Sequence, residues 1–356
     1  MEISFIISIP FSESLEEVKL MGVSSSKIPD SNSNTDINTC TTESIDTSTT
    51  NCAACGKEGG NLNTCNKCKM VKYCNAACKK KHRSKHKKAC ERRVAELHDE
   101  ALFKEPPPRE ECPICLLPLP LDATQKTFHC CCGKTICNGC VYAMFKEALG
   151  RGGELGMCAF CRKPKPNSVE DEIKWLMKLV DADNGDAVHA LASLYFNGLK
   201  GMPQDTTKAN ELILRAGELG CVDAYFNLGL AYEHGRGVEM DKKKAKHFYE
   251  LAAMNGDVNA RHNLGSMEAD AGNVHRAYLH FLLAAKAGFK MSLDQVKQRF
   301  MDGMVTKDEY ANTLRAFQSR QDEMKSDTRG KAEILGVGWQ SAFIEMSGAS
   351  SGMILE

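Results

Sequence analysis

From residue 170 onward, apolar side chains recur with the spacing of an amphipathic helix. Ile173, Leu176, Met177 and Val180 fall three or four positions apart, and charged residues occupy many of the positions between them. Side chains at this spacing lie on one face of an α-helix and can be buried together. The pattern therefore predicts a helix at residues 170–180, at the start of a helical region.

A second pattern shows that this helical region contains repeats. Short segments rich in Ala, Leu, Gly and Tyr recur at 190–198, 225–238 and 261–272. Each is followed by a second predicted helix, at 208–217, 244–253 and 276–285. The second helices end at Gly220, Gly256 and Gly288, which are 36 and then 32 residues apart. A period of this length predicts antiparallel helix pairs stacked into a solenoid.

The middle repeat carries the fullest form of the pattern. It contains Leu228-Gly229, Tyr232, Gly235-Arg-Gly237-Val, Lys244-Ala245 and Ala252-Ala253. These residues resemble Sel1-like repeats, which are relatives of the tetratricopeptide class. The first repeat lacks the Leu-Gly pair and the third lacks the long turn, so both are expected to be end repeats. The resemblance implies an all-α array with end caps, over residues 170–322, that binds other proteins.

The remaining segments predict shorter elements. Residues 91–103 and 141–149 have apolar positions at helical spacing, and Pro106 is expected to end the first of these helices. Residues 1–51 and most of residues 323–356 contain few side chains that can form a core. Both tails are therefore expected to be largely disordered.

The 356-residue chain contains 18 cysteines, and their context indicates metal binding. Residues 3–9 are apolar, but Glu2 stands where a signal peptide has a basic residue, so secretion is not expected. The sequence contains no apolar run of about 18 residues, so no membrane-spanning helix is expected. Paired cysteines in a reducing compartment are typical of zinc sites, and the expected location is the cytoplasm or the nucleus.

The densest group of cysteines lies at residues 112–161. It reads Cys-Pro-Ile-Cys, then Cys-Cys-Cys-Gly-Lys-Thr-Ile-Cys-Asn-Gly-Cys, then Cys-Ala-Phe-Cys-Arg. Pairs separated by two residues suit tetrahedral zinc, because a tight turn points both thiolates at one ion about 2.3 Å away. The stretch resembles a RING domain, in which pairs one and three share one zinc and pairs two and four share another. The resemblance assigns one site to Cys112, Cys115, Cys137 and Cys140, and the other to Cys130, Cys132, Cys158 and Cys161.

The central pair of this stretch leaves two choices of ligand. Most RING domains have a histidine here, but this chain has Lys134, whose ammonium group cannot bind zinc. The pair is closer to that of the all-cysteine RING of the ubiquitin ligase subunit in the cytoplasmic deadenylase complex, which reads Cys-x-Cys-Gly. That pattern selects Cys130 and Cys132, and the competing choice is His129 with Cys131.

Residues 52–90 carry a second ligand set, spaced Cys-x2-Cys-x9-Cys-x2-Cys-x5-Cys-x3-Cys-x7-His-x3-Cys. His86 and Cys90 are four residues apart, so both can reach one ion from one helix face; His82 lacks this spacing. The spacing is very similar to that of the MYND zinc finger. The resemblance assigns one zinc to Cys52, Cys55, Cys74 and Cys78, and another to Cys65, Cys68, His86 and Cys90.

The MYND resemblance implies binding of proline-containing peptides and no catalytic role. Arg83 stands where the family usually has a tryptophan that helps to shape the peptide groove. Pro106 to Pro108 would be a conceivable ligand in the same chain, but they are expected to stiffen the linker.

Charge argues against a general nucleic-acid binder. The formal net charge is zero with cysteines counted as neutral, and ligand thiolates would make the zinc-bound protein acidic. Seven basic residues lie between Lys79 and Lys88. They are expected to form a solvated helix face beside the anionic zinc centres.

The RING resemblance implies a small apolar surface for a ubiquitin-conjugating enzyme. Arg162, directly after the last cysteine, matches a basic residue that contacts both that enzyme and ubiquitin. Ala159 stands where ligase RINGs usually have proline. No residue is expected to be catalytic, because the conjugating enzyme makes the bond. The apolar positions that match are Ile114, Leu116 or Leu117, Met144 or Phe145, and more loosely Pro164.

These patterns predict a multidomain protein in which two small zinc-stabilised α+β modules precede an all-α helical-repeat solenoid. The leading hypothesis is a RING-type E3 ubiquitin ligase that binds four zinc ions and holds protein partners on its finger and repeats. The alternative is a non-enzymatic adaptor. The expected layout is a tail (1–51), a MYND-type finger (52–90), a helical and proline-rich linker (91–111), a RING-type finger (112–162), repeats (170–322) and a second tail (323–356).

Overall fold

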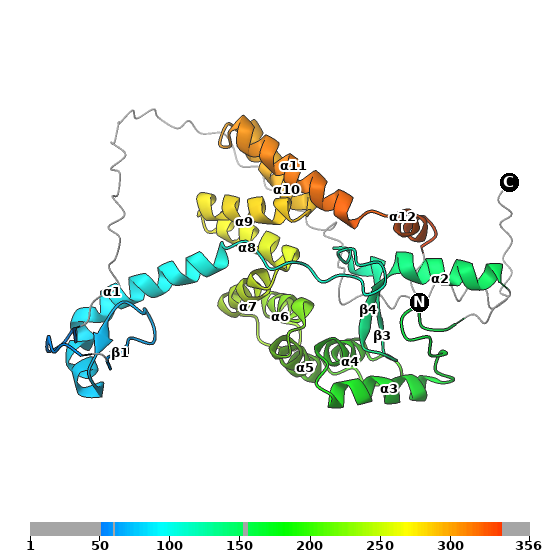
Figure 1. Cartoon of the computed structure of the whole chain (residues 1–356), viewed down its shortest axis with the longest axis horizontal. Coiled ribbons are helices and arrows are strands. Elements are labelled where there is room, and N and C mark those ends of the chain that lie inside the picture. The colour runs from blue at the N-terminus through cyan, green and yellow to red at the C-terminus, as the bar shows by residue number, and fades with distance from the viewer. Residues whose placement is uncertain (1–50, 60, 152–155, 337–356) are drawn as a thin grey trace. The chain divides into compact units, whose positions relative to one another are not determined.

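The structure, a computed structural model, describes residues 51–59, 61–151 and 156–336 (Figure 1). The described residues form two compact units, one up to Leu102 and one from Phe103 onward. The tail predicted at residues 1–51 lies outside the described residues apart from Asn51.

The first unit is a small finger followed by a long helix. Strand β1 (Asn63–Thr64) pairs antiparallel with β2 (Lys72–Tyr73), and helix α1 spans Ala76–Leu102. The predicted helix at residues 91–103 is confirmed as the continuation of the last helix of the finger. The buried core of the finger consists of Cys52, Cys65, Cys68 and Tyr73. A core made mostly of sulfur ligands buries too little apolar surface to hold so small a module by itself.

The second unit begins with another small module at residues 112–164. A 3-10 turn, η2 (Ala123–Gln125), leads into strand β3 (Lys126–His129), which pairs antiparallel with β4 (Lys134–Cys137). Helix α2 (Asn138–Gly150) follows and confirms the helix predicted at residues 141–149. Leu119, Ile136 and Val141 are buried among the cysteines and form its core.

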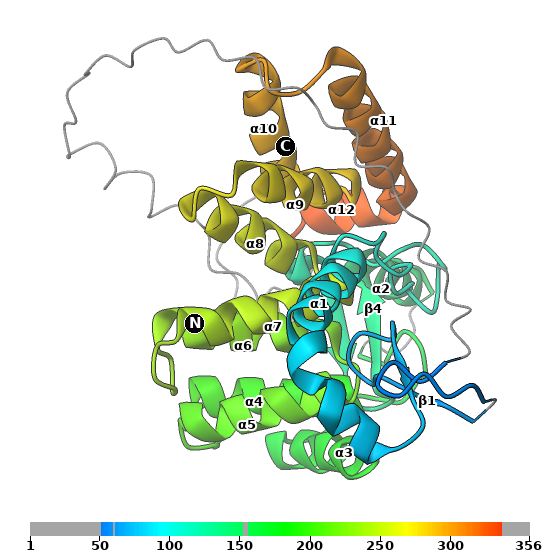
Figure 2. The ribbon, with the colours of Figure 1, turned by 90° about the vertical axis from the view of Figure 1, so that its left-hand side faces the viewer.

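The rest of the second unit is the predicted solenoid. Figure 2 shows its helices stacked in successive pairs. Helix α3 (Val169–Asp181) precedes the first pair and confirms the predicted cap. Three pairs follow, α4 (Gly185–Asn197) with α5 (Thr206–Glu218), α6 (Val222–His234) with α7 (Lys242–Met254), and α8 (Val258–Asp270) with α9 (Val274–Lys286). Helices α10 (Lys290–Met301) and α11 (Lys307–Met324) close the array.

The glycine of the Leu-Gly pair lets the two helices of a repeat approach closely. A Cβ atom on Gly229 would lie 2.3 Å from the ring of Tyr249, which is fully buried. Gly265 faces Phe281 in the same way, at 2.7 Å. The first repeat has Ala192 and the smaller Ile213 at these two positions. In each repeat, therefore, the residue on the first helix is small enough to fit the side chain opposite: glycine is matched with an aromatic ring and alanine with isoleucine.

A second recurring contact joins the two helices near the solvent edge. Lys208 lies over the ring of Tyr195, 4.0 Å from its centre, and Lys244 lies over Tyr232 at 5.1 Å. In the third repeat Glu268 takes the place of the tyrosine and pairs with Arg276 at 3.2 Å and Lys246 at 2.8 Å. These cations hold the pKa of the buried Glu268 carboxyl at about 2, despite the opposing effect of burial.

The second small module is packed against the first repeats. Phe128 and Cys130 on its hairpin contact the core cluster that includes Leu176 and Val188. The Lys126 ammonium group lies 3.1 Å from the carboxylate of Asp223 in α6. The module and the solenoid thus share one apolar core and an ion pair.

The expectation of a mostly disordered tail from residue 323 is wrong for its first part. Helix α11 continues to Met324, and a further helix, α12, spans Asp327–Ile334. The sequence pattern missed α12 because the helix is short and mostly polar, and Ala332 and Arg329 are its only buried residues. Residues 337–356 lie outside the described part of the chain.

We predict that Gly229→Ala lowers the free energy of unfolding of the solenoid by about 1–3 kcal/mol, because the new methyl group overpacks the interface with Tyr249. Helical circular dichroism during denaturant unfolding measures this change. The matched control is Gly330→Ala in α12, where a Cβ meets no atom within 4 Å; it should be neutral or stabilising. The double variant Gly229→Ala/Tyr249→Ile copies the pair of the first repeat. Its loss of unfolding free energy should be smaller than the sum of the losses in the two single variants. Additive losses would contradict the proposed fit.

Candidate metal centres

Four turns with the same backbone geometry present cysteine pairs. In each Cys-x-x-Cys turn, the residue after the second cysteine has a positive φ and donates its N–H to the carbonyl of the first cysteine. Such a turn directs both sulfurs to one side, as a shared metal ion requires. The residues with positive φ, and their N···O distances, are Gly56 (2.8 Å), Lys69 (3.0 Å), Leu116 (2.9 Å) and Arg162 (3.0 Å).

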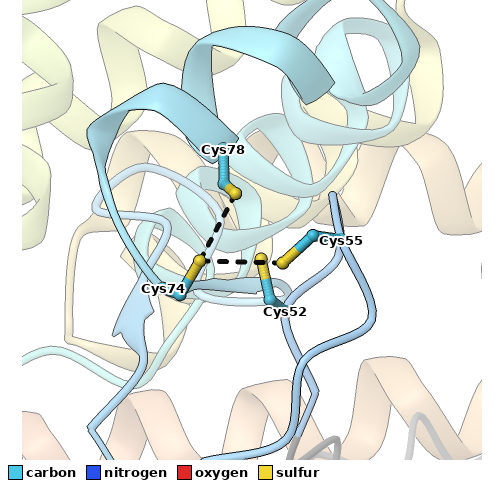
Figure 3. Close-up of side chains that lie close together, drawn as sticks. All are labelled: Cys52, Cys55, Cys74 and Cys78. Atoms are coloured by element: carbon cyan, nitrogen blue, oxygen red, sulfur yellow. Dashed lines mark hydrogen bonds between the residues drawn. The ribbon is translucent and has the colours of Figure 1, made fainter.

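The finger brings its eight predicted ligands together as two groups. Figure 3 shows the side chains of the first group, Cys52, Cys55, Cys74 and Cys78, pointing toward one another. Cys74 Sγ lies 3.7 Å from Cys55 Sγ and 3.3 Å from Cys78 Sγ. The second group comprises Cys65, Cys68, His86 and Cys90.

His86 is the histidine of the second group, as its spacing to Cys90 predicted. Its Nε2 atom lies 3.2 Å from Cys68 Sγ, and Cys65 Sγ lies 3.9 Å from Cys90 Sγ. His82 supports this site without joining it. Its ring stacks on that of His86 with centres 5.9 Å apart, and its Nδ1 atom lies 3.2 Å from the hydroxyl of Tyr73.

The second module also forms two groups, and their members alternate along the chain. The first group is Cys112, Cys115, Cys137 and Cys140, as predicted. The second is Cys131, Cys132, Cys158 and Cys161. Pairs one and three therefore meet at one point and pairs two and four at another. The closest sulfur pairs are 3.8 Å apart in the first group and 3.5–3.9 Å apart in the second.

The prediction of Cys130 as a ligand is wrong, because Cys131 occupies that place. Strand β3 ends at His129, and Gly133 closes the turn by donating its N–H to the His129 carbonyl at 2.9 Å. Side chains alternate along a strand, so Cys130 follows Phe128 onto the face that packs against the repeats. Of the competing choice, His129 with Cys131, the structure brings Cys131 into the group but not His129. The period-two pattern groups Cys130 with Phe128, but only the contact of Phe128 with the repeats shows that this face is turned away from the ligand group.

The spacing of the ligand atoms fits zinc. Four sulfurs arranged tetrahedrally about 2.3 Å from one ion are about 3.8 Å apart, and the closest sulfur pairs lie at 3.3–3.9 Å. A disulfide would need about 2.05 Å, and all 17 cysteines among the described residues are free. Each group supplies four ligands, which is the complement of a closed structural site.

Thiols so close together cannot all ionise unless a cation joins them. In the finger, a hydrogen bond from the backbone of Cys74 lowers the pKa of the Cys52 thiol to about 6. The neighbouring Cys74 side chain raises the pKa of Cys78 to about 12. A divalent ion removes this conflict, because it binds thiolates and displaces their protons.

The residues proposed to contact a conjugating enzyme all reach solvent. Ile114 is 41% exposed and Leu116 is 67% exposed, beside the first cysteine pair. Arg162 is exposed and Phe145 on α2 is half-buried. These four side chains lie outside the buried core of the module, so the apolar ones are available for a partner.

Comparison with known protein families matches two parts of the chain. Residues 52–90 match the MYND finger, and residues 185–221, 222–257 and 260–289 match the Sel1 repeat. The chain carries a MYND finger and Sel1 repeats. The two groups of residues 52–90 described above could hold the metal ions of the MYND finger, and the three Sel1 repeats are the helix pairs α4–α5, α6–α7 and α8–α9.

Relatives share only part of this chain. The ERAD-associated E3 ubiquitin-protein ligase component HRD3A of Arabidopsis thaliana is 31% identical over 117 residues, which is 32% of this chain and 17% of that protein. The corresponding component HRD3B of Arabidopsis thaliana is 29% identical over 120 residues, which cover 33% of this chain and 18% of that protein. Chitin synthase regulatory factor 2 of Schizosaccharomyces pombe is 24% identical over 155 residues, which cover 38% of this chain and 29% of that protein. The chain thus spans less than a third of the length of each of these relatives.

Among solved structures, a Sel1 repeat protein from Oxalobacter formigenes matches 51% of this chain and 71% of its own, with 22% identity and a TM-score of 0.38. The protective antigen c5321 of uropathogenic Escherichia coli, which has an SLR fold, matches 56% of this chain and 48% of its own, with 18% identity and a TM-score of 0.29. Among the described residues, none of the helices has the length and apolar character needed to span a membrane.

We predict that Cys131→Ser removes one zinc ion per chain, whereas Cys130→Ser leaves the zinc content unchanged. Serine preserves the size of either side chain but replaces the thiolate that zinc prefers. Native mass spectrometry counts the ions directly. The two positions are adjacent, so each variant is the control for the other. Loss of zinc from Cys130→Ser with retention in Cys131→Ser would contradict the assigned ligand set.

Proposed function

We propose that residues 112–162 form a RING-type module that recruits a ubiquitin-conjugating enzyme, and that the protein acts as an E3 ubiquitin ligase. The observation that supports this most is the alternating use of cysteine pairs in two four-ligand groups. A RING domain requires this interleaved order, whereas consecutive zinc knots would pair neighbours along the chain. With two ions in this module and two in the MYND finger, the protein would bind four.

The proposed role of the module is positioning. A lysine amine of the substrate attacks the thioester carbon of the charged conjugating enzyme, an isopeptide bond forms, and the enzyme's cysteine leaves as a thiol. Ile114, Leu116 and Phe145 would hold the enzyme, and Arg162 would contact both enzyme and ubiquitin. Holding the thioester in one orientation lowers the entropic part of the barrier. Each group offers four candidate protein ligands, so a bound ion would have no open position, and a positioning role needs none.

The other parts of the chain would hold protein partners. Repeat arrays present extended surfaces that bind other proteins, and a cavity of about 1190 Å3 lies beside the hairpin and the starts of the repeat helices. The MYND finger would take proline-containing peptides. The Arabidopsis relatives are named as components of an E3 ubiquitin ligase, which agrees with a role in the same type of assembly. Free thiols throughout the described residues agree with the cytoplasm or the nucleus.

A non-enzymatic adaptor is the second candidate, and one observation favours it. The last cysteine pair contains Ala159 where ligase RINGs usually have proline, and Arg162 of the proposed enzyme-binding surface follows three residues later. In this alternative the module keeps its two zinc ions and its fold but does not activate a conjugating enzyme.

An assay with the purified full chain separates the two candidates. With E1, a panel of conjugating enzymes, ubiquitin and ATP, we expect the protein to build ubiquitin chains on itself. Ile114→Ala should lower the rate by roughly tenfold or more, since an apolar anchor at an interface contributes about 2 kcal/mol. Cys115→Ser should abolish the activity, because it removes a zinc ligand.

The matched control is Met240→Ala. Met240 is also an exposed apolar side chain, at 64%, but it lies in the repeats, so its loss should leave chain formation unchanged. If a broad panel yields no chains from protein with its full zinc content, the ligase is ruled out and the adaptor is favoured.

A further inference from the structure

Helix α12 buries one face against the second module. Arg329 is 8% exposed and Ala332 is 2% exposed, three positions apart on the same side of the helix. Together with the N-terminal end of α2, they line a small cavity of about 210 Å3. An eight-residue helix therefore has a defined docking site almost two hundred residues away in the sequence, and the Arg329 side chain donates hydrogen bonds from it to the second module.

The Arg329 guanidinium group binds the loop that follows the first cysteine pair. One nitrogen donates to the carbonyl of Pro118 at 2.7 Å and to that of Met324 at 2.8 Å. The other donates to the carbonyl of Leu117 at 3.3 Å and to Cys115 Sγ at 3.4 Å. Arginine suits this task because its planar fork offers several donors in a fixed geometry. One cation thus reaches both a metal ligand and the loop beside it.

The second module is shaped to receive α12 at this point. A Cβ atom on Gly139 would lie 2.8 Å from the backbone nitrogen of Arg329 and 2.9 Å from its Cα atom. Backbone atoms cannot move aside as a flexible side chain can. Gly139 lies inside the Cys137-Asn-Gly-Cys140 pair, so the ligand segment and the helix are fitted to each other.

The segment that carries α12 is also anchored to the solenoid. Gln321 on α11 donates to the carbonyl of Gly288 at 2.8 Å. Arg109, just before the first cysteine pair, donates to Met324 Sδ at 2.9 Å. Ser326 caps α12 by accepting the N–H of Arg329. The segment directly before α12 is therefore held in place, and with it the start of the helix that carries Arg329.

We infer that Arg329 is a positioning residue of the second module, although it lies in the C-terminal segment of the chain. It completes the outer shell of the Cys112, Cys115, Cys137 and Cys140 group and fixes the loop that presents Leu116. Four thiolates and one Zn²⁺ leave a charge of about −2, which a donating guanidinium stabilises. The consequence for recruitment of a conjugating enzyme rests on the function proposed above; the consequence for the metal group does not.

The test compares zinc release from the full-length variants Arg329→Met and Arg329→Lys with that from wild type. Methionine keeps the apolar stem of the side chain and removes the guanidinium. With a chromogenic chelator in excess, one ion should leave Arg329→Met about 10–100-fold faster, since outer-shell partners contribute that much to metal affinity. Arg329→Lys keeps the charge but cannot reach all the acceptors, so it should fall in between. Hydrogen exchange at residues 114–119 should rise in parallel.

The matched control is Arg320→Ala, because Arg320 is half-exposed on α11 and pairs only with Glu323 among the contacts described. It should release zinc at the wild-type rate. Wild-type release and exchange in Arg329→Met would overturn the inference. If wild type builds ubiquitin chains, zinc-loaded Arg329→Met should build them more slowly. If wild type builds none, the proposed ligase fails while the release rates still decide the role of Arg329.

Discussion

The shape of both small modules depends on the crowding of ligand atoms in four groups. Within each group the four atoms lie within 4.8 Å of one another, a spacing that thiolates tolerate only around a cation. The finger has little else to hold it, because its buried core consists of three cysteines and Tyr73. Metal binding and folding are therefore expected to be one process in these modules, whereas the Sel1 repeats are held by apolar packing.

In the second unit of the chain, a module that depends on metal ligands is packed against repeats that are held by apolar packing. The hairpin of the second module shares the apolar core of the first repeats through Phe128, and Lys126 pairs with Asp223. At the other end of the array, Arg329 joins the module to the closing helices. The solenoid thus holds the module at two places. A partner bound to the repeats would act on a module that is packed against them rather than tethered to them.

Spacing predicted most of the fold and most of the candidate sites. Ligands separated by two residues, or by four on a helix, leave few alternatives, which is why His86 was separable from His82. The second ligand pair of the second module was harder to predict, because three consecutive cysteines, Cys130 to Cys132, allow more than one choice of two ligands. The choice of Cys131 depends on which side of β3 faces the repeats, and that is a tertiary contact. Helix α12 was missed for the same reason, since Arg329 is buried by distant segments and not by a local apolar pattern.

The most direct test is a zinc count on the intact full chain, combined with hydrogen exchange before and after chelation. The account predicts four ions per chain, and a loss of protection at residues 52–90 and 112–162 when they are removed. Protection within helices α6–α9 should remain. Two ions or fewer in well-folded protein, or unchanged protection of both modules after complete removal of zinc, would contradict it.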